Sequence, residues 1–256
     1  AEDSQLIGEI ANTDSRSFTA DQTQQEVAQA FARSNLMSAP VVDEDNRQLG
    51  RITVDDVVDV IQDEADRMMM APAGLDEEED IFAPVIQTSR SRAVWLGINL
   101  ITAFIAAVAI GRFQETISSL VALAVLMPVV ASMGGNIGIQ SLTVVIRGMG
   151  NGTITDKNAA RVFFKELLVG SLNGLVWAVV VAIVTLLWFD NLALAIIISF
   201  AMVITMISSA LFGALLPVFL RRIGIDPALA GGVALTTVAD VVGFVSFLGL
   251  AAVFLT

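Results

Sequence analysis

Five long apolar segments, all in the last two thirds of the chain, constrain its fold more than any other feature. A helix crosses the hydrocarbon core of a bilayer with about 20 predominantly apolar residues. Segments of this kind cover residues 93–110, 117–146, 167–189, 192–220 and 228–255. The sequence therefore predicts a mostly α, polytopic membrane protein with five transmembrane helices per chain.

The charges divide the chain into two unlike parts. Residues 1–80 hold 20 of the 26 acids but 5 of the 14 bases, a net charge of −15, whereas residues 81–256 carry a net charge of +3. We predict a cytoplasmic segment over residues 1–66, an acidic linker or plug helix over 67–92 and a pore domain over 93–256. The acidic segment disfavours nucleic acid as a partner, because phosphate backbones are bound by basic surfaces.

The chain contains no histidine and no cysteine. This excludes Ser-His-Asp triads, thiol nucleophiles and Cys/His zinc sites, and an enzyme is not expected. The remaining ligands are carboxylate, amide, hydroxyl and carbonyl oxygens, which are the ligands of hard cations such as Mg2+ and Ca2+.

The basic residues predict the orientation in the plasma (inner) membrane. Basic residues concentrate in the cytoplasmic loops of membrane proteins. With five spans, one side of the membrane has Arg112, and the other has Arg90, Arg92, Arg147, Lys157, Arg161, Lys165, Arg221 and Arg222. We therefore expect a cytoplasmic N-terminus, an extracytoplasmic C-terminus and lipid around the five spans.

The second apolar segment carries a row of polar residues. Ser132, Asn136 and Gln140 recur every fourth residue and share one helix face. The neighbouring Gly134 and Gly135 let a ligand or another backbone approach closely. We interpret these five residues as pore-lining, with the Asn136 amide as a metal ligand. The alternative is helix packing, because small and amide residues also join membrane helices.

Asp240 is the only carboxylate deep inside a predicted span, and no Lys or Arg lies at a matching depth. A charge there costs several kcal/mol unless it is paired or hydrated, so we expect it to face water or a cation. Thr236, one turn earlier, and Thr237 add oxygens. A symmetric dimer would bring two Asp240 carboxylates together. The alternative is a protonated, hydrogen-bonded Asp240 that stabilises packing.

The N-terminal part alternates short strands and helices, and resembles one cystathionine-beta-synthase (CBS) motif. The matching residues are Ala39-Pro-Val-Val-Asp43 and Gly50-Arg-Ile-Thr53-Val-Asp-Asp56. The resemblance implies a small α/β segment in which Thr53 and Asp56 contact an adenine nucleotide such as ATP. A helix cap formed by the same two residues is the alternative.

The predicted helix over residues 55–70 has an acidic face. Asp55, Asp59, Asp63 and Asp66 lie on one side of it, and Glu64 flanks them. Like charges four residues apart repel, which favours a cation-binding surface. The acidic run 76–80 reads equally well as a solvated linker.

Motifs along the membrane part resemble the MgtE magnesium channels. They are Met127-Pro128, Gly134-Gly135-Asn136-x-Gly138-x-Gln140-Ser141, Arg161-Val-Phe-Phe-Lys165-Glu166, Leu220-Arg-Arg-x-Gly224-x-Asp226-Pro-Ala-Leu229 and Thr237-x-x-Asp240-Val241. The resemblance implies a homodimer whose pore is lined by the second and fifth spans and selects Mg2+ at Asp240. It also implies closure by cytosolic Mg2+ at acids that include Asp59, Glu64, Asp66 and Asp226. Asp226 directly before Pro227 is also the pattern of a helix start, with Asp at the N-cap and Pro at the first helical position. Ile137 and Ile139 are apolar where the family pattern suggests polar residues.

We therefore predict a channel that conducts hydrated Mg2+. The alternatives are an ion-coupled secondary transporter that uses Asp240 as its coupling site, and a nucleotide sensor on an inert anchor.

Overall fold

The computed structural model of the chain describes residues 16–71, 82–155 and 157–255. The chain divides into two compact units, residues 1–66 and 67–256, and each is described here by itself. The predicted acidic run 76–80 lies outside the described residues, as do residues 72–81 of the predicted linker.

The first unit is the predicted small α/β segment. Strand β2 pairs with β1 in parallel and with β3 antiparallel. The core contains Phe18, Phe31 and Val57, and the Phe18 and Phe31 rings stack at 5.7 Å. The elements are β1 Phe18–Thr19, α2 Gln24–Ser34, β2 Ser38–Val42, β3 Gln48–Thr53 and α3 Val54–Met70. The division between the units falls within α3, whose residues from Arg67 on belong to the second unit.

The second unit contains five helices that are long and apolar enough to cross a membrane, which confirms the predicted architecture. The five are α4 Val85–Gly111, α6 Ala122–Gly150, α7 Ala159–Phe189, α8 Leu192–Arg222 and α9 Pro227–Phe254. Cap residues explain some of the boundaries: Asn191 caps α8 by accepting the Leu194 N–H at 3.0 Å, and Asp226 caps α9.

Three helix starts differ from the prediction. A separate short helix, α5 (Gln114–Ser119), precedes α6, because the extended backbone of Leu120 (φ −142°, ψ 92°) breaks the helix that was expected to begin at residue 117. Helix α7 begins at Ala159 rather than at residue 167. The earlier start brings Glu166 inside a membrane helix. Residues 85–92 of the predicted linker form the beginning of α4.

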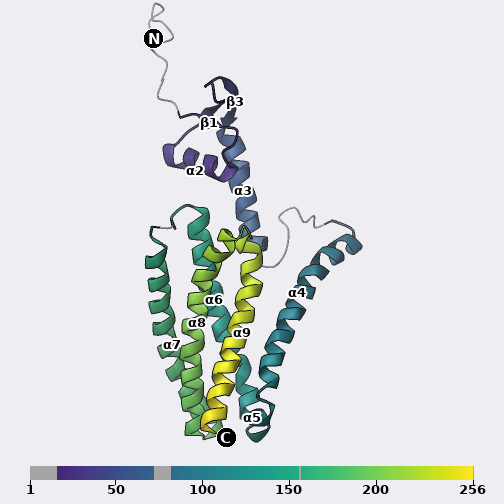
Figure 1. Cartoon of the computed structure of the whole chain (residues 1–256), viewed down its shortest axis with the longest axis vertical. Helices are drawn as coiled ribbons and strands as arrows, with labels where there is room; N and C mark the ends of the chain where they lie inside the picture. The colour runs from purple at the N-terminus through teal and green to yellow at the C-terminus, as the bar shows by residue number, and fades with distance from the viewer. Residues whose placement is uncertain (1–15, 72–81, 156, 256) are drawn as a thin grey trace, which may run out of the picture. The chain divides into compact units, whose positions relative to one another are not determined.

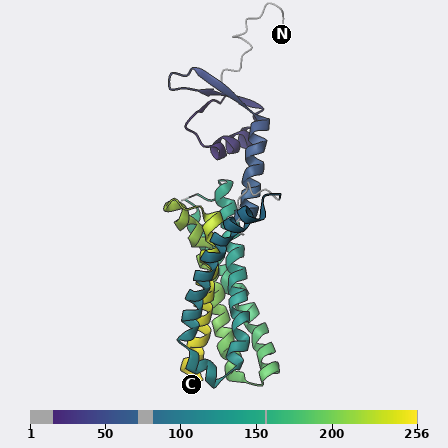
Figure 2. The ribbon, with the colours of Figure 1, turned by 90° about the vertical axis from the view of Figure 1, so that its right-hand side faces the viewer.

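Helix α8 is the centre of the bundle. It packs against α6, α7 and α9, whereas α4 packs mainly against α9 (Figures 1 and 2). Its buried side chains include Ile198, Met202 and Ala210. Half of the residues in the apolar stretch of α8 are buried, whereas 6% of those in the apolar stretch of α4 are buried. Among the described helices, α4 therefore leaves the most apolar surface for lipid or another chain.

Glycines set the register between α6 and its neighbours. A methyl group at Gly138 would lie 3.0 Å from Leu235 Cδ1, and one at Gly134 would lie 3.8 Å from Ala239 Cβ. Further along, Gly243 faces Val130 at 3.4 Å. Along this contact the residue numbers of α9 increase while those of α6 decrease, so the two helices are antiparallel. Close backbone approach through small residues is the usual way in which membrane helices associate.

We predict opposite effects from the same substitution at two neighbouring glycines. A methyl group at Gly134 would meet Thr205 Cγ2 at 2.5 Å, whereas one at Gly135 would meet nothing within 4 Å. Gly134→Ala should destabilise the protein by about 1–3 kcal/mol through overpacking. Gly135→Ala should be neutral or stabilising by up to about 1 kcal/mol, because alanine favours the helix. Thermal unfolding of the two purified variants in detergent tests this, and equal melting temperatures would contradict the packing.

Candidate functional site

The predicted polar row lies on the outer face of α6. Ser132, Asn136 and Gln140 are exposed in the single chain, and Thr143 and Arg147 extend the row toward the end of the helix. Gly135 is half-buried. Gly134 is buried instead, and packs on the side of Thr205 and Ala239. It therefore belongs to the helix contact, and the other predicted residues form the open face.

The oxygens of α9 line up on one side of that helix. Thr236 donates its hydroxyl proton to the carbonyls of Gly232 and Val233, each at 3.1 Å. Thr237 donates to the carbonyl of Val233 at 2.8 Å. Because the hydroxyl protons are used by the backbone, the lone pairs of both oxygens remain available to a cation or to its water.

Asp240 follows Thr236 by one helical turn and is half-buried. In the part of the chain that the structure describes, its carboxylate has no hydrogen bond or ion pair. Its neighbour Ala239 lies at the depth of Gly134, so Asp240 lies between the depths of Ser132 and Asn136. The register thus brings the predicted oxygens of α6 and α9 to one level of the bundle.

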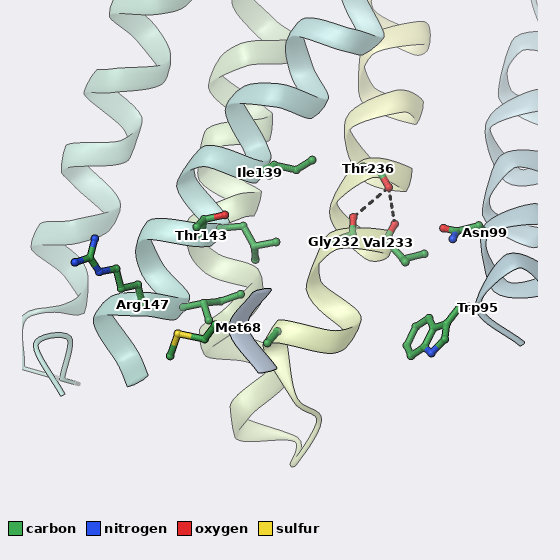
Figure 3. A pocket seen from close by; sticks show the side chains of 12 residues that line it. Met68, Trp95, Asn99, Ile139, Thr143, Arg147, Gly232, Val233 and Thr236 are labelled. Carbon is green, nitrogen blue, oxygen red and sulfur yellow. Dashed lines mark hydrogen bonds between the residues drawn. The ribbon is translucent and has the colours of Figure 1, made fainter. Parts of the chain in front are cut away.

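A cavity of about 460 Å³ opens between α4, α6 and α9 (Figure 3). Ile139 and Thr143 of α6 extend toward α9, which presents Thr236, while Asn99 of α4 lies on the far side. Met68 also lines the cavity. Its wall on α9 runs through Gly232 and Thr236, which share a helix face with Asp240. Thr236, which lines the cavity, therefore lies one helical turn from Asp240.

Asp226, a predicted metal ligand, has two partners in the structure. Its side chain accepts the Ala228 N–H at 2.9 Å and so caps α9. Its other carboxylate oxygen pairs with the Arg67 guanidinium. Sequence reasoning considered the cap but overlooked Arg67, which carries a single positive charge among the acids of α3.

The acids of α3 do not converge within the chain. Among residues 16–71, 82–155 and 157–255, no group of three or more acidic side chains is close enough to hold a metal ion. The predicted metal ligands of α3 therefore do not form such a group among the described residues. They are Asp59, Asp63, Glu64 and Asp66. A cation at this face would need ligands from elsewhere, such as a second copy of the chain.

Thr53 and Asp56 bond to each other at the start of α3, which is one half of the helix cap that was the alternative to nucleotide binding. The Asp56 carboxylate accepts the Thr53 N–H and the Thr53 hydroxyl, both at 2.9 Å. A hydrogen bond from the Thr53 side chain also lowers the pKa of Asp55, so that acid stays ionised near the start of α3, where the helix dipole favours negative charge. Binding of an adenine nucleotide stays a prediction.

Glu166 is a buried acid that sequence reasoning left outside the third span. Asp240 was expected to be the only carboxylate deep inside a span, and α7 contains and buries a second acid, Glu166, at its eighth residue. The Ser141 hydroxyl of α6 donates to its Oε2 at 2.7 Å. A prediction that the third span begins at residue 159 would have placed Glu166 inside it.

The sequence matches two family models. Residues 127–250 match the divalent cation transporter family MgtE, and residues 7–63 match the CBS domain. The chain is 35% identical over 244 residues to the magnesium transporter MgtE of Bacillus subtilis, which covers 94% of the chain and 54% of the relative. It is 33% identical over 254 residues to the protein of the same name from Enterococcus faecalis, covering 99% of the chain and 56% of the relative. The chain thus spans about half the length of the curated relatives it matches.

The two roles of Asp226 can be separated by substitution. Asp226→Asn should keep the cap and lose the ion pair, and such partly exposed pairs contribute at most about 1 kcal/mol. Asp226→Ala should lose both, with a further loss of about 1 kcal/mol for the cap. Asn191→Ala, which removes the cap of α8, is the matched control for the cap alone. The melting temperature in detergent should be lower for Asp226→Asn than for the wild type, and lower again for Asp226→Ala. Equal values for the two variants would refute the cap.

Proposed function

The membrane domain of this chain belongs to the MgtE family of divalent cation transporters, and we propose that the chain works as a Mg2+ channel. In this proposal hydrated Mg2+ passes along the polar row of α6 and the oxygens of α9, with Asp240 as the selecting carboxylate. The observation that carries the proposal is the Asp240 side chain, half-buried in a membrane helix with no partner among the described residues.

The chemistry of these groups suits a hydrated ion. Mg2+ gives up its water reluctantly and is usually held by one or two carboxylates with several waters retained. The amide oxygens of Asn136 and Gln140 and the hydroxyl oxygens of Thr236 and Thr237 can accept hydrogen bonds from such waters. A channel that strips its ion would instead need a ring of carbonyl oxygens.

The proposed pore is shared by two chains. One chain supplies one Asp240 and leaves the polar row of α6 exposed, which is costly in lipid because polar groups there have no water. A second copy across a twofold axis would cover this row and add a second carboxylate. The B. subtilis and E. faecalis relatives are named magnesium transporters, which supports Mg2+ as the transported ion.

The distribution of basic residues supports insertion in the plasma (inner) membrane with the N-terminus in the cytoplasm and the C-terminus outside. In this orientation the cavity beside Met68 opens toward the cytoplasm. We propose that cytosolic Mg2+ closes the pore by binding to acids of the CBS segment and the linker. The carboxylates of Asp59, Asp63 and Asp66 on one side of α3 repel each other, and a cation between two chains would relieve this repulsion.

Asp240→Asn should lower Mg2+ flux into liposomes by at least about tenfold, because each 1.4 kcal/mol of lost ion stabilisation is tenfold in an equilibrium constant. Asp190→Asn is the matched control: Asp190 is an exposed carboxylate at the end of α7, and its neutralisation should leave the flux unchanged. Wild-type flux through the Asp240→Asn channel would remove the pore assignment.

The same carboxyl could instead carry a proton or sodium ion in a secondary transporter. This alternative is favoured by the isolation of Asp240, since a coupling site must exchange its cation. Currents across a planar bilayer separate the two: a channel gives unitary openings whose reversal potential follows Mg2+ alone. A reversal potential that moves with an imposed proton or sodium gradient would favour the transporter.

The gating proposal makes a separate prediction. Replacing Asp59 and Asp63 together by Asn should leave Mg2+ conduction open at millimolar cytosolic Mg2+, because the acidic face would lose half of its ligands. Limited proteolysis gives a second measurement, in which Mg2+ should protect the wild-type linker but not the variant. Asp43→Asn and Asp45→Asn, in an exposed turn of the same unit, are the control. Protection that persists in the double variant would argue against this face as the sensor.

A further inference from the structure

Glu166 is an acid that the proposed conduction path does not use. It lies in α7 with 6% of its surface exposed, and its partner Ser141 in α6 is 2% exposed. The Ser141 Oγ donates to Glu166 Oε2 at 2.7 Å, a bond between residues 25 positions apart. This buried pair joins α7 to the helix that carries the polar row.

Small residues of α8 make room for the pair. A methyl group at Gly213 would lie 3.0 Å from Ser141 Cβ, so Ser141 lies directly against the α8 backbone. On α7, a methyl group at Gly170 would lie 2.8 Å from Ala210 Cβ. One turn further along this antiparallel contact, Glu166 reaches the depth of Ala214, next to Gly213. Larger side chains at these two α8 positions would separate α6 from α7.

The pair adds a directional bond to a glycine-rich stretch of α6. Pro128 removes a backbone hydrogen bond in the helix, while Gly134 and Gly138 bring α6 close to α8 and α9. Ser141 lies about one turn beyond Gly138, and its neighbour Gln140 belongs to the exposed polar row. The bond at Ser141 therefore acts together with the glycine contacts to hold the rotation of the part of α6 that presents Gln140.

Stability alone does not account for a carboxyl at this position. A buried polar pair is often no more stabilising than an apolar pair of the same shape, but loss of one partner leaves the other unsatisfied. Such a pair does hold two helices in one rotational setting. A directional bond from a rigid helix is what a selective path needs, since small displacements of liganding groups change binding steeply.

We propose that Glu166 is a positioning residue for cation selection, which acts through Ser141 to set the rotation of α6. This inference rests on the proposed channel function and assigns Glu166 no contact with the ion. The bond belongs to both side chains, so Ser141→Ala and Glu166→Ala should have the same effect. Glu166→Gln should preserve function, because its amide oxygen still accepts the Ser141 hydroxyl.

The experiment measures Mg2+ and Co2+ flux into liposomes that hold equal amounts of folded wild type, Ser141→Ala, Glu166→Ala, their double variant and Glu166→Gln. Loss of a buried hydrogen bond should lower Mg2+ flux about fivefold or more in the first two variants and change the Mg2+ to Co2+ ratio by about threefold. The double variant should be no worse than either single one, because the two side chains act as a unit. Glu166→Gln should stay within about twofold of wild type.

Ser199→Ala is the matched control. The Ser199 hydroxyl of α8 donates to the Ala178 carbonyl of α7 at 3.1 Å and to the Ala195 carbonyl of its own helix at 2.7 Å. Ser199→Ala therefore removes a helix-to-helix bond that does not involve α6. It should leave the ion ratio unchanged. Ser141→Ala, a small change, keeps the test valid if Glu166→Ala does not fold. An unchanged ratio in Ser141→Ala, or a shift that Ser199→Ala reproduces, overturns the positioning role alone. Wild-type protein without Mg2+ flux overturns the channel proposal together with it.

Discussion

The close approach of α6 to α8 and α9 at glycines is the contact on which the rest of the membrane unit depends. In lipid, helices gain little from the hydrophobic effect, and dispersion between closely packed backbones holds them together. Gly134, Gly138 and Gly213 provide this contact. Because the contact fixes which side of α6 is buried, it also fixes which side is open. The polar row is exposed as a consequence, and Asp240 of α9 lies at its depth.

The two carboxylates within membrane helices, Glu166 and Asp240, differ in their burial and in their hydrogen-bond partners, and this difference suggests different roles. Glu166 is more deeply buried and has a hydroxyl donor on a neighbouring helix. Asp240 is half-buried, and in the described chain it has no such donor. A carboxyl that is already satisfied has little reason to attract an ion, whereas an unsatisfied one in a membrane must find water, a proton or a cation. The contrast supports a structural task for Glu166 and an exchangeable one for Asp240.

Much of the architecture could be predicted from hydropathy, because membrane helices must satisfy their backbone internally and are therefore recognisable by their length. The helix face of Ser132, Asn136 and Gln140 followed from spacing alone. The start of α7 did not, because the polar residues Arg161, Lys165 and Glu166 hide a helix that begins before the apolar run. Gly134 is buried and the adjacent Gly135 is half-buried because of their tertiary contacts. The sequence cannot predict this difference, since the two residues are the same.

The same limit explains Asp226. Its position before Pro227 predicted a helix cap, and its likeness to family acids predicted a metal ligand. The structure directs one of its oxygens to the Ala228 N–H and the other to Arg67, a residue 159 positions away that no local pattern connects to it. A guanidinium on this carboxylate competes with any divalent cation for the same oxygens. Mg2+ bound at Asp226 would therefore have to displace Arg67, so the affinity of this acid for Mg2+ depends on how firmly the last turn of α3 is held.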